Sequence, residues 1–223
     1  MPTSTVHAAV AFVLAVGLLG EYYDRRALAV ILGIVLFPEV DTAFGLVMDG
    51  AHRTVLHTML TSVVAAGVVY WDTSREGSWI RGRWGASGVR LAWVGVFVHT
   101  FAHLGLDWAH LSGINIVWPL VDQFFSLDGE LYLSSTEGLV QTFVDIAVDP
   151  ETGQQTIDAG RGGTTANTHV SSPVQPSKET SEGPVDRRFP IAVGGWQLYF
   201  LVVGAFTLLA RRLQSTPEEI GDH

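Results

Sequence analysis

Cysteine is absent from the 223 residues of this sequence, and lysine occurs only once, at Lys178. Without cysteine the chain has neither disulfides nor thiolate ligands, so a bound metal must be held by histidine, carboxylates, carbonyl groups or water. The formal net charge is -9, and the other basic residues are arginines. An acidic composition poor in lysine is typical of high-salt organisms such as halophilic archaea. The shortage of basic patches argues against a nucleic-acid partner, because nothing would neutralise the phosphates.

Hydrophobic residues make up 48% of the chain and gather in five runs. These runs predict an all-α fold, a multi-pass bundle of about five membrane helices, at His7–Gly20, Ala27–Phe37, Val55–Trp71, Leu91–Leu106 and Ile191–Ala210. The last run is the clearest span, with 20 residues and no charge. The second run stops at Pro38 and rises only about 16 Å. No basic residue precedes the first run, so we expect a retained helix rather than a cleaved signal peptide.

Composition divides the chain into four parts. We expect a membrane-embedded helical domain with the metal site over residues 1–125, a largely disordered polar acidic loop over 126–188, a C-terminal transmembrane helix over 189–212 and a tail over 213–223. Within the first part, Ser112–Phe125 is apolar but broken by glycine and proline, which favours a re-entrant or packed segment. Within the second part, the alternation in Leu131–Val148 is compatible with a small hairpin.

The arginines predict how the helices cross the membrane. If the five helices alternate, Arg25 and Arg26, the arginines of loop 72–90 and Arg211 with Arg212 fall on one side, which should be cytoplasmic. Arg187 and Arg188 depart from this pattern. The acidic loop would then lie outside, together with the polar residues described next.

The segment FVHTFAHLGLD, residues 97–107, sets His99, His103 and Asp107 into an apolar helix at four-residue intervals. At helical pitch these side chains lie along one face, and an imidazole one turn from a carboxylate can bind a divalent cation. Alternating helices bring further polar residues to the same end of the bundle, namely His7, Glu39, Asp41, His52 and His57. We interpret this agreement as one assembled site.

Each motif also has a plainer interpretation. The pair Glu39 and Asp41 after Pro38 can bind a cation, or one carboxylate can bind it while the other activates water. The same pair can equally be an acidic loop after a helix. Arg53, between His52 and His57, can hold an oxyanion, or these residues can cap and anchor the helix. A histidine inside an apolar helix is commonly structural.

Taken in order, these motifs resemble the YdjM-like family of membrane-bound metal-dependent hydrolases, also described as LexA-binding inner-membrane-associated putative hydrolases. The resemblance covers about residues 1–120. The matching residues are His7, Pro38-Glu39-x-Asp41, His52-Arg53-x-x-x-His57-Thr58, His103-x-x-x-Asp107 and Gly113-x-x-x-x-Trp118-Pro119. In the family's pattern an aspartate stands where this chain has Glu39, and a histidine stands where it has Thr42. Glutamate can still ligate a metal, and His99 is a candidate to replace the lost histidine.

The leading hypothesis is therefore a membrane-embedded metallohydrolase. The resemblance implies one or two divalent ions, zinc or manganese by ligand type, held by His7, Asp41, His57, His103 and Asp107. Glu39 is the candidate base, with Arg53 or His52 stabilising the developing anion. A site at the membrane boundary suits a phosphoester or lipid-like substrate, and membrane lipid is the expected partner. The alternative is a non-enzymatic membrane protein whose cluster is structural or conducts ions.

Overall fold

The computed structural model describes residues 3–46, 52–110, 112–127, 129, 131–134, 138–148, 155–158, 160–168 and 195–214. The chain forms two compact units. One, here called the helical unit, comprises Pro2–Glu39, Thr61–His103 and Thr180–His223. The other, here called the loop unit, comprises Met1, Val40–Leu60 and Leu104–Glu179.

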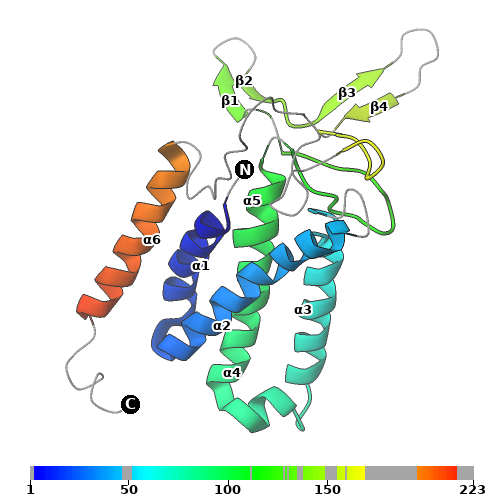
Figure 1. Ribbon diagram of the computed structural model, residues 1–223. Coiled ribbons are helices and arrows are strands. Elements are labelled where there is room, and N and C mark those ends of the chain that lie inside the picture. The colour runs from blue at the N-terminus through cyan, green and yellow to red at the C-terminus, as the bar shows by residue number, and fades with distance from the viewer. Residues whose placement is uncertain are drawn as a thin grey trace. The chain divides into compact units, whose positions relative to one another are not determined.

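The helical unit is a bundle of apolar helices (Figure 1). Its elements are α1 (Ser4–Leu19), the 3-10 turn η1 (Gly20–Tyr22), α2 (Arg25–Leu36), most of α3 (Met59–Thr73), α4 (Trp79–Val98) and α6 (Gly195–Gln214). Helix α1 packs against α2, α4 and α6, and α2 also packs against α4. The core between these helices consists of small and branched side chains, among them Ala11, Ala15, Ile31, Val35 and Val98. Small residues let helix backbones approach closely, as membrane helices require.

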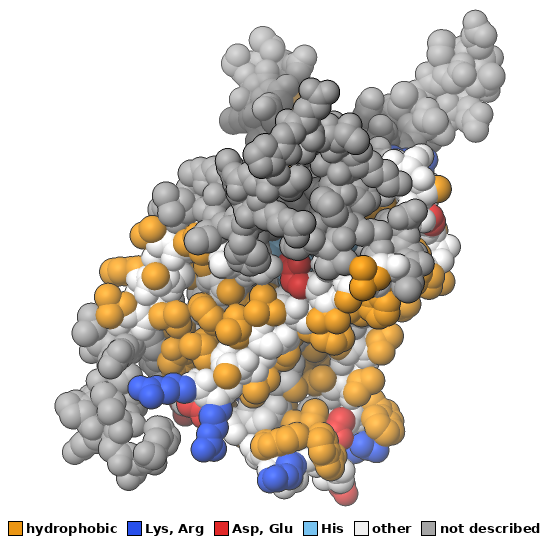
Figure 2. All heavy atoms as spheres, in the orientation of Figure 1, with side chains coloured by type: hydrophobic (Ala, Val, Ile, Leu, Met, Phe, Trp, Pro, Cys, Tyr) orange, Lys and Arg blue, Asp and Glu red, His pale blue; other side chains and the backbone are white. Residues whose placement is uncertain are grey.

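The predicted fold class, an all-α membrane bundle of about five helices, is confirmed. Among the described residues, three helical stretches are long and apolar enough to cross a membrane, at Ser4–Tyr22, Arg25–Phe44 and Trp79–Trp108. Within α6 the apolar part found among the described residues is shorter, Phe200–Leu209. Many large apolar side chains point outward, and Figure 2 shows them spread over the helices. Such exposure suits lipid rather than water as the surrounding solvent.

The start of the fourth helix differs from the prediction, which began it at Leu91 after a loop over 72–87. Helix α4 begins twelve residues earlier, at Trp79. Its N-cap Ser78 accepts a hydrogen bond from the Arg81 amide, and Asp72 accepts from the amides of Trp79 and Ile80. These bonds satisfy backbone amides in the first turn, so the helix can begin within a polar segment. The helix bends at Gly85, where φ is 66°.

The second α-helix ends at Leu36, close to the predicted stop at Pro38, but the chain stays helical beyond this point. It changes from α to 3-10 geometry and continues as η2 (Phe37–Leu46). The ring of Pro38 fixes φ near the helical value, so the chain can remain helical there while the hydrogen-bonding pattern changes. Glu39 and Asp41 therefore lie on a helical continuation of α2 rather than in a loop.

The third helix begins at Met59, four residues later than the predicted Val55. A distant segment holds its first turn, since the Met59 amide donates to the Ile116 carbonyl and the Thr58 hydroxyl bonds the carbonyls of Ile116 and Trp118. Residues 52–58 consequently form turns, and His57 precedes the helix. This contact joins residues almost sixty positions apart, which local periodicity cannot reveal.

The loop unit contains the remaining irregular and strand segments. Residues 112–127 are not helical, in agreement with the predicted packed segment, and Phe125 forms bridges with both Ile114 and Arg161. Two antiparallel hairpins follow, β1 (Leu131–Ser134) with β2 (Gly138–Gln141), and β3 (Asp145–Val148) with β4 (Gln155–Asp158). The first lies where the alternation suggested a hairpin. Residues 169–194 and 215–223 lie outside the described residues, so the predicted disorder and tail there stay predictions.

Candidate metal centre

The segment with the regularly spaced polar residues is a continuous helix that changes pitch. Helix α4 passes into a π-helical segment, η3 (His99–Leu104), and then into the short α5 (Gly105–Trp108). His99, His103 and Asp107 are all buried on it. A π turn holds more residues than an α turn and is frequent at functional sites. The predicted one-turn spacing of His103 and Asp107 is thus retained on a wider helix.

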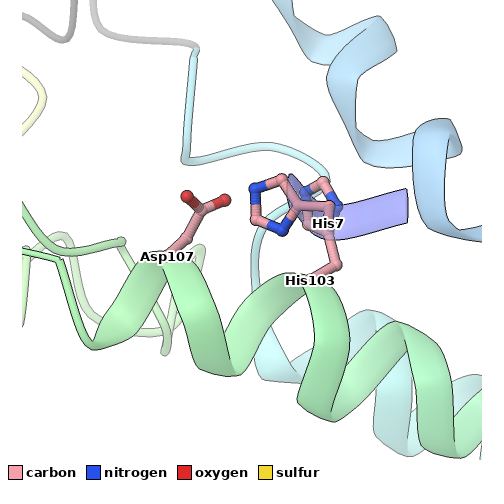
Figure 3. Close-up of side chains that lie close together, drawn as sticks. All are labelled: His7, His103 and Asp107. Atoms are coloured by element: carbon pink, nitrogen blue, oxygen red, sulfur yellow. The ribbon is translucent and has the colours of Figure 1, made fainter. Parts of the chain in front are cut away.

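His7, His103 and Asp107 form a group that could hold a metal ion (Figure 3). Each side chain offers one ligand atom, and these atoms lie within 4.8 Å of one another. His7 comes from the first turns of α1, and its ring stacks on that of His103 at a centroid distance of 4.3 Å. Asp107 projects one turn further along the helix of His103. Two imidazoles and one carboxylate are a common ligand set of zinc centres that keep an open position.

The hydrogen bond of His7 favours metal binding. Its Nδ1 lies 2.9 Å from the carbonyl oxygen of Ala102. A carbonyl only accepts, so Nδ1 carries the proton and Nε2 keeps its lone pair. Metal-binding histidines are typically oriented by such a bond from the other ring nitrogen.

In the loop unit, Asp41 binds two histidines. Its carboxylate accepts from His57 Nδ1 at 2.7 Å, from His52 Nδ1 at 3.0 Å and from the Arg53 amide at 3.1 Å. Asp41 is fully buried, and these three donors compensate for its lost hydration. The structure therefore places Asp41 behind the histidine rings, where it orients them. Its predicted role as a direct ligand stays a prediction.

His57 and Asp107 face each other at a distance where a proton or a metal ion between them is favourable. His57 Nε2 lies 3.4 Å from Asp107 Oδ2. Because His57 Nδ1 already donates to Asp41, a neutral ring would point its Nε2 lone pair at a carboxylate, which is repulsive. Either a proton on Nε2 or a shared metal ion removes the repulsion. The observed 3.4 Å fits a long N–H to carboxylate hydrogen bond, and it also equals the separation of about 3.4 Å between two ligands of a tetrahedral ion at 2.0–2.2 Å.

The two neighbouring carboxylates also shift the pKa of His57. Burial alone would lower the pKa of His57, but the hydrogen bonds and charges of Asp107 and Asp41 outweigh it and raise the pKa to about 9. A metal ion would compete with that proton, so metal binding at His57 is expected to be coupled to proton release.

Arg53 is a fully buried arginine with an unusual backbone. Its φ is 62°, in the left-handed region that non-glycine residues rarely adopt. The guanidinium donates to Asp107 Oδ1 at 2.8 Å and to the Gly113 carbonyl at 3.3 Å. The Arg53 carbonyl accepts from the Asn115 amide at 3.1 Å. Arg53 thus fixes one oxygen of Asp107 and leaves the other facing His57.

The remaining predicted residues lie at different places. Glu39 is half-buried in η2, two residues before Asp41. Thr42, which stands where the family pattern has histidine, lies 3.2 Å through its hydroxyl from His52 Nδ1. His99 lies outside the three-residue group and hydrogen-bonds Thr61 at 3.1 Å. His52 belongs to the Asp41 network.

Asn115 has a structural role near the site that the sequence did not predict. It is fully buried, and besides holding the Arg53 carbonyl it donates to Asp122 at 2.7 Å and accepts from the Gln123 amide. It therefore connects Arg53 to the segment that follows the helix. A signal was present, since Asn115 lies inside the Gly113–Pro119 motif, but a single asparagine in an apolar run also fits a turn.

The fold and the site together define a helical membrane protein with a buried histidine and aspartate centre that can hold a metal ion. The chain belongs to the YdjM inner membrane protein family, whose family model matches residues 1–161. Comparisons with curated proteins and with solved structures give no match. The family assignment confirms the resemblance noted in the sequence, and it extends through the hairpins of the loop unit.

Proposed function

We propose that the protein is a membrane-embedded metal-dependent hydrolase. The observation that carries the proposal is the buried group His7, His103 and Asp107, whose ligand atoms lie within 4.8 Å of one another. His57 is the candidate fourth ligand because it faces Asp107 at 3.4 Å. Nitrogen and oxygen donors without sulfur favour zinc or manganese.

A divalent ion held there would supply a bound water of lowered pKa and polarise the scissile bond. The chain's own residues prepare the ligands. Asp41 holds the His57 ring in the tautomer with Nε2 directed at Asp107, and Arg53 restrains the Asp107 carboxylate. Such outer partners raise ligand basicity and fix ring orientation.

Glu39 is the proposed base, and His52 or Arg53 is proposed to stabilise the negative charge that develops on the substrate. Glu39 lies on the same helical segment as Asp41 and is only half-buried, so it can reach solvent or substrate. Arg53 is already engaged by Asp107 and Gly113, which favours His52 for direct contact and a positioning role for Arg53. A site at helix ends within a membrane protein suits an amphiphilic phosphoester or lipid-like substrate.

We further propose that the centre lies on the non-cytoplasmic side. In the helical unit, Arg25 and Arg26 begin α2, and Arg75, Arg81 and Arg83 surround the start of α4. His7 lies near the opposite end of α1 from η1, which leads to α2. The positive-inside rule assigns the arginine end to the cytoplasm.

The test is a hydrolysis screen on the full-length protein in detergent, with water-soluble phosphodiesters and phospholipids as substrates. We expect activity that a chelator abolishes and that zinc or manganese restores, with Glu39→Gln lowering turnover but sparing bound metal. Glu76→Gln is a matched control, because Glu76 is an exposed glutamate in the turn between α3 and α4. Protein that retains stoichiometric metal but hydrolyses none of these substrates would favour the alternative, a structural or ion-conducting cluster.

A further inference from the structure

In the helical unit, a groove that the metal centre does not use runs along α4 and the start of η3, beside Leu18 of α1. Its volume is about 350 Å3, and its lining includes Leu18, Arg90, Trp93, Phe97 and Phe101. The three aromatic residues follow one another at four-residue spacing, so they form a continuous ridge along the helix. Phe97 is 40% exposed and Phe101 is 57% exposed. The wall is therefore apolar and open to the surroundings of the bundle.

Arg90 supplies a positive charge at one end of this groove. Its Nε donates to the Leu18 carbonyl at 2.7 Å, which fixes the guanidinium beside the last turn of α1. Among the described residues no carboxylate forms an ion pair with Arg90, although Glu21 lies in an adjoining hollow that Arg90 also lines. An arginine side chain has five N–H donors, and the bond to Leu18 uses only the one on Nε. A phosphate group is the ligand that this geometry suits best.

The length of the groove matches one leaflet of a membrane. Arg90 and Phe101 are eleven residues apart on a helix, which corresponds to about 16 Å. Half of a hydrocarbon core is about 15 Å thick. Arg90 lies next to the end of the span Ser4–Tyr22, the level at which a headgroup would lie. The groove therefore has a charged end at headgroup depth and an apolar wall of acyl-chain length.

We propose that this groove is a binding site for one anionic phospholipid, with the phosphate at Arg90 and an acyl chain along Trp93, Phe97 and Phe101. The lipid is a bound component and not the substrate. Its headgroup lies beside Leu18, whereas His7 of the metal centre lies eleven residues earlier on α1, about 16 Å away along the helix. The site therefore stands independently of the proposed hydrolase activity.

The test is native mass spectrometry of the full-length protein in detergent, titrated with phosphatidylglycerol or phosphatidylcholine. We expect one tightly bound phosphatidylglycerol, preferred over phosphatidylcholine by about fivefold for the single charge. Arg90→Gln should abolish the preference, and Arg90→Lys should retain most of it. Arg83→Gln is the matched control, because Arg83 is an exposed arginine of the same helix outside the groove. Glu21→Gln should strengthen the preference by removing a nearby negative charge.

Val96→Trp should fill the groove and weaken the binding of both lipids while leaving Arg90 in place, which separates the acyl-chain contact from the charge. Thermal unfolding of each variant verifies folding. Equal binding of the two lipids by the unmodified protein would overturn the proposal, as would an equal loss in Arg83→Gln. Competition by inorganic phosphate as strong as that of the lipid would also overturn it, since it would show a free-phosphate site. Displacement of the lipid by a second copy of the chain would do the same.

Discussion

Asp41 determines which ring nitrogens of two histidines are available. It accepts from Nδ1 of both His57 and His52, so Nε2 of each ring points away from it. In the sequence, Asp41 is one of two acidic residues that follow a proline, and it is predicted to be a direct metal ligand like Asp107. The tertiary structure separates Asp41, which orients His57, from Asp107, which belongs to the three-residue metal group.

At this scale we predict that Asp41→Asn weakens metal binding by about 10–100-fold, the usual effect of removing a partner that orients a metal ligand. An amide cannot replace the charge-assisted bonds to both rings. The measurement is a competition titration of zinc with a chromogenic chelator. Thr42→Val is the control, because Thr42 contacts only the His52 ring of this pair in the described structure. Unchanged zinc affinity in Asp41→Asn would show that Asp41 does not support the centre.

The site residues that the sequence predicts are those whose positions in or beside the apolar runs are regular. His103 and Asp107 lie one helical turn apart, and His7, His57 and Asp41 begin or end neighbouring helices. Arg53 could be recognised as a candidate, but not its left-handed backbone or its bond to Asp107. In the structure Arg53 contacts Asp107, Gly113 and Asn115, all more than fifty residues later. Non-local backbone contacts of this kind leave no local pattern.

At the scale of elements, helix packing depends on a close contact between α1 and α6. A side-chain carbon added at Gly204 would lie 3.0 Å from the backbone oxygen and Cα of Ala9. Backbone atoms cannot move aside as a flexible side chain can. We predict that Gly204→Leu destabilises the bundle by about 1–3 kcal/mol, the usual cost of overpacking, in thermal unfolding monitored in detergent. Gly67→Leu is the matched control, since in the described part of the chain a carbon added there would meet no atom within 4 Å beyond its own helix backbone. Equal effects of the two substitutions would exclude the contact as the cause.

The turn between α3 and α4 depends on Asp72, which lies outside the three long spans. The Ser78 hydroxyl, two backbone amides and Arg75 donate to it and hold its pKa down, at about 2. A carboxylate whose pKa is lowered by folding stabilises the protein above its unfolded pKa, 3.8, and that stabilisation disappears as the pH falls toward about 2. We predict that Asp72→Asn is less stable than the unmodified protein at pH 7 and that the difference shrinks below pH 3.8. Chemical unfolding at several pH values measures it, and a constant difference would contradict the assignment.

The exact ends of the helices could not be predicted from the local sequence. The apolar runs located every long helix, but the early start of α4 depends on capping by Ser78 and Asp72, and the late start of α3 depends on the carbonyls of residues 116 and 118. The polar composition of residues 72–87 predicted a loop. Composition does not reveal the capping hydrogen bonds that allow a helix to begin within this segment. Pro38 correctly indicated the end of α2, at Leu36, but not the 3-10 segment η2 that follows it.

At the scale of the whole molecule, the arrangement of arginines predicts the orientation in the membrane. Single cysteines at Glu76 and Leu139 can report it, because the protein has no cysteine of its own and both positions are exposed. We predict that a membrane-impermeant thiol reagent labels Leu139→Cys in intact cells and labels Glu76→Cys only after permeabilisation. The reverse pattern would place the metal centre on the cytoplasmic side. The family membership and the three spans do not depend on the outcome.

Metal analysis of the purified full-length protein tests the claim that His7, His103 and Asp107 hold a metal ion. The protein is purified in detergent without chelators, incubated with zinc or manganese, separated from free metal and measured by mass spectrometry of its elements. His99→Ala is the matched control, because His99 is a buried histidine of the same π-helical segment that lies outside the group. The structure predicts about one tightly bound ion per chain, retained in His99→Ala and lost in His103→Ala. Unmodified protein that binds neither metal, or equal loss in the two variants, would contradict the claim.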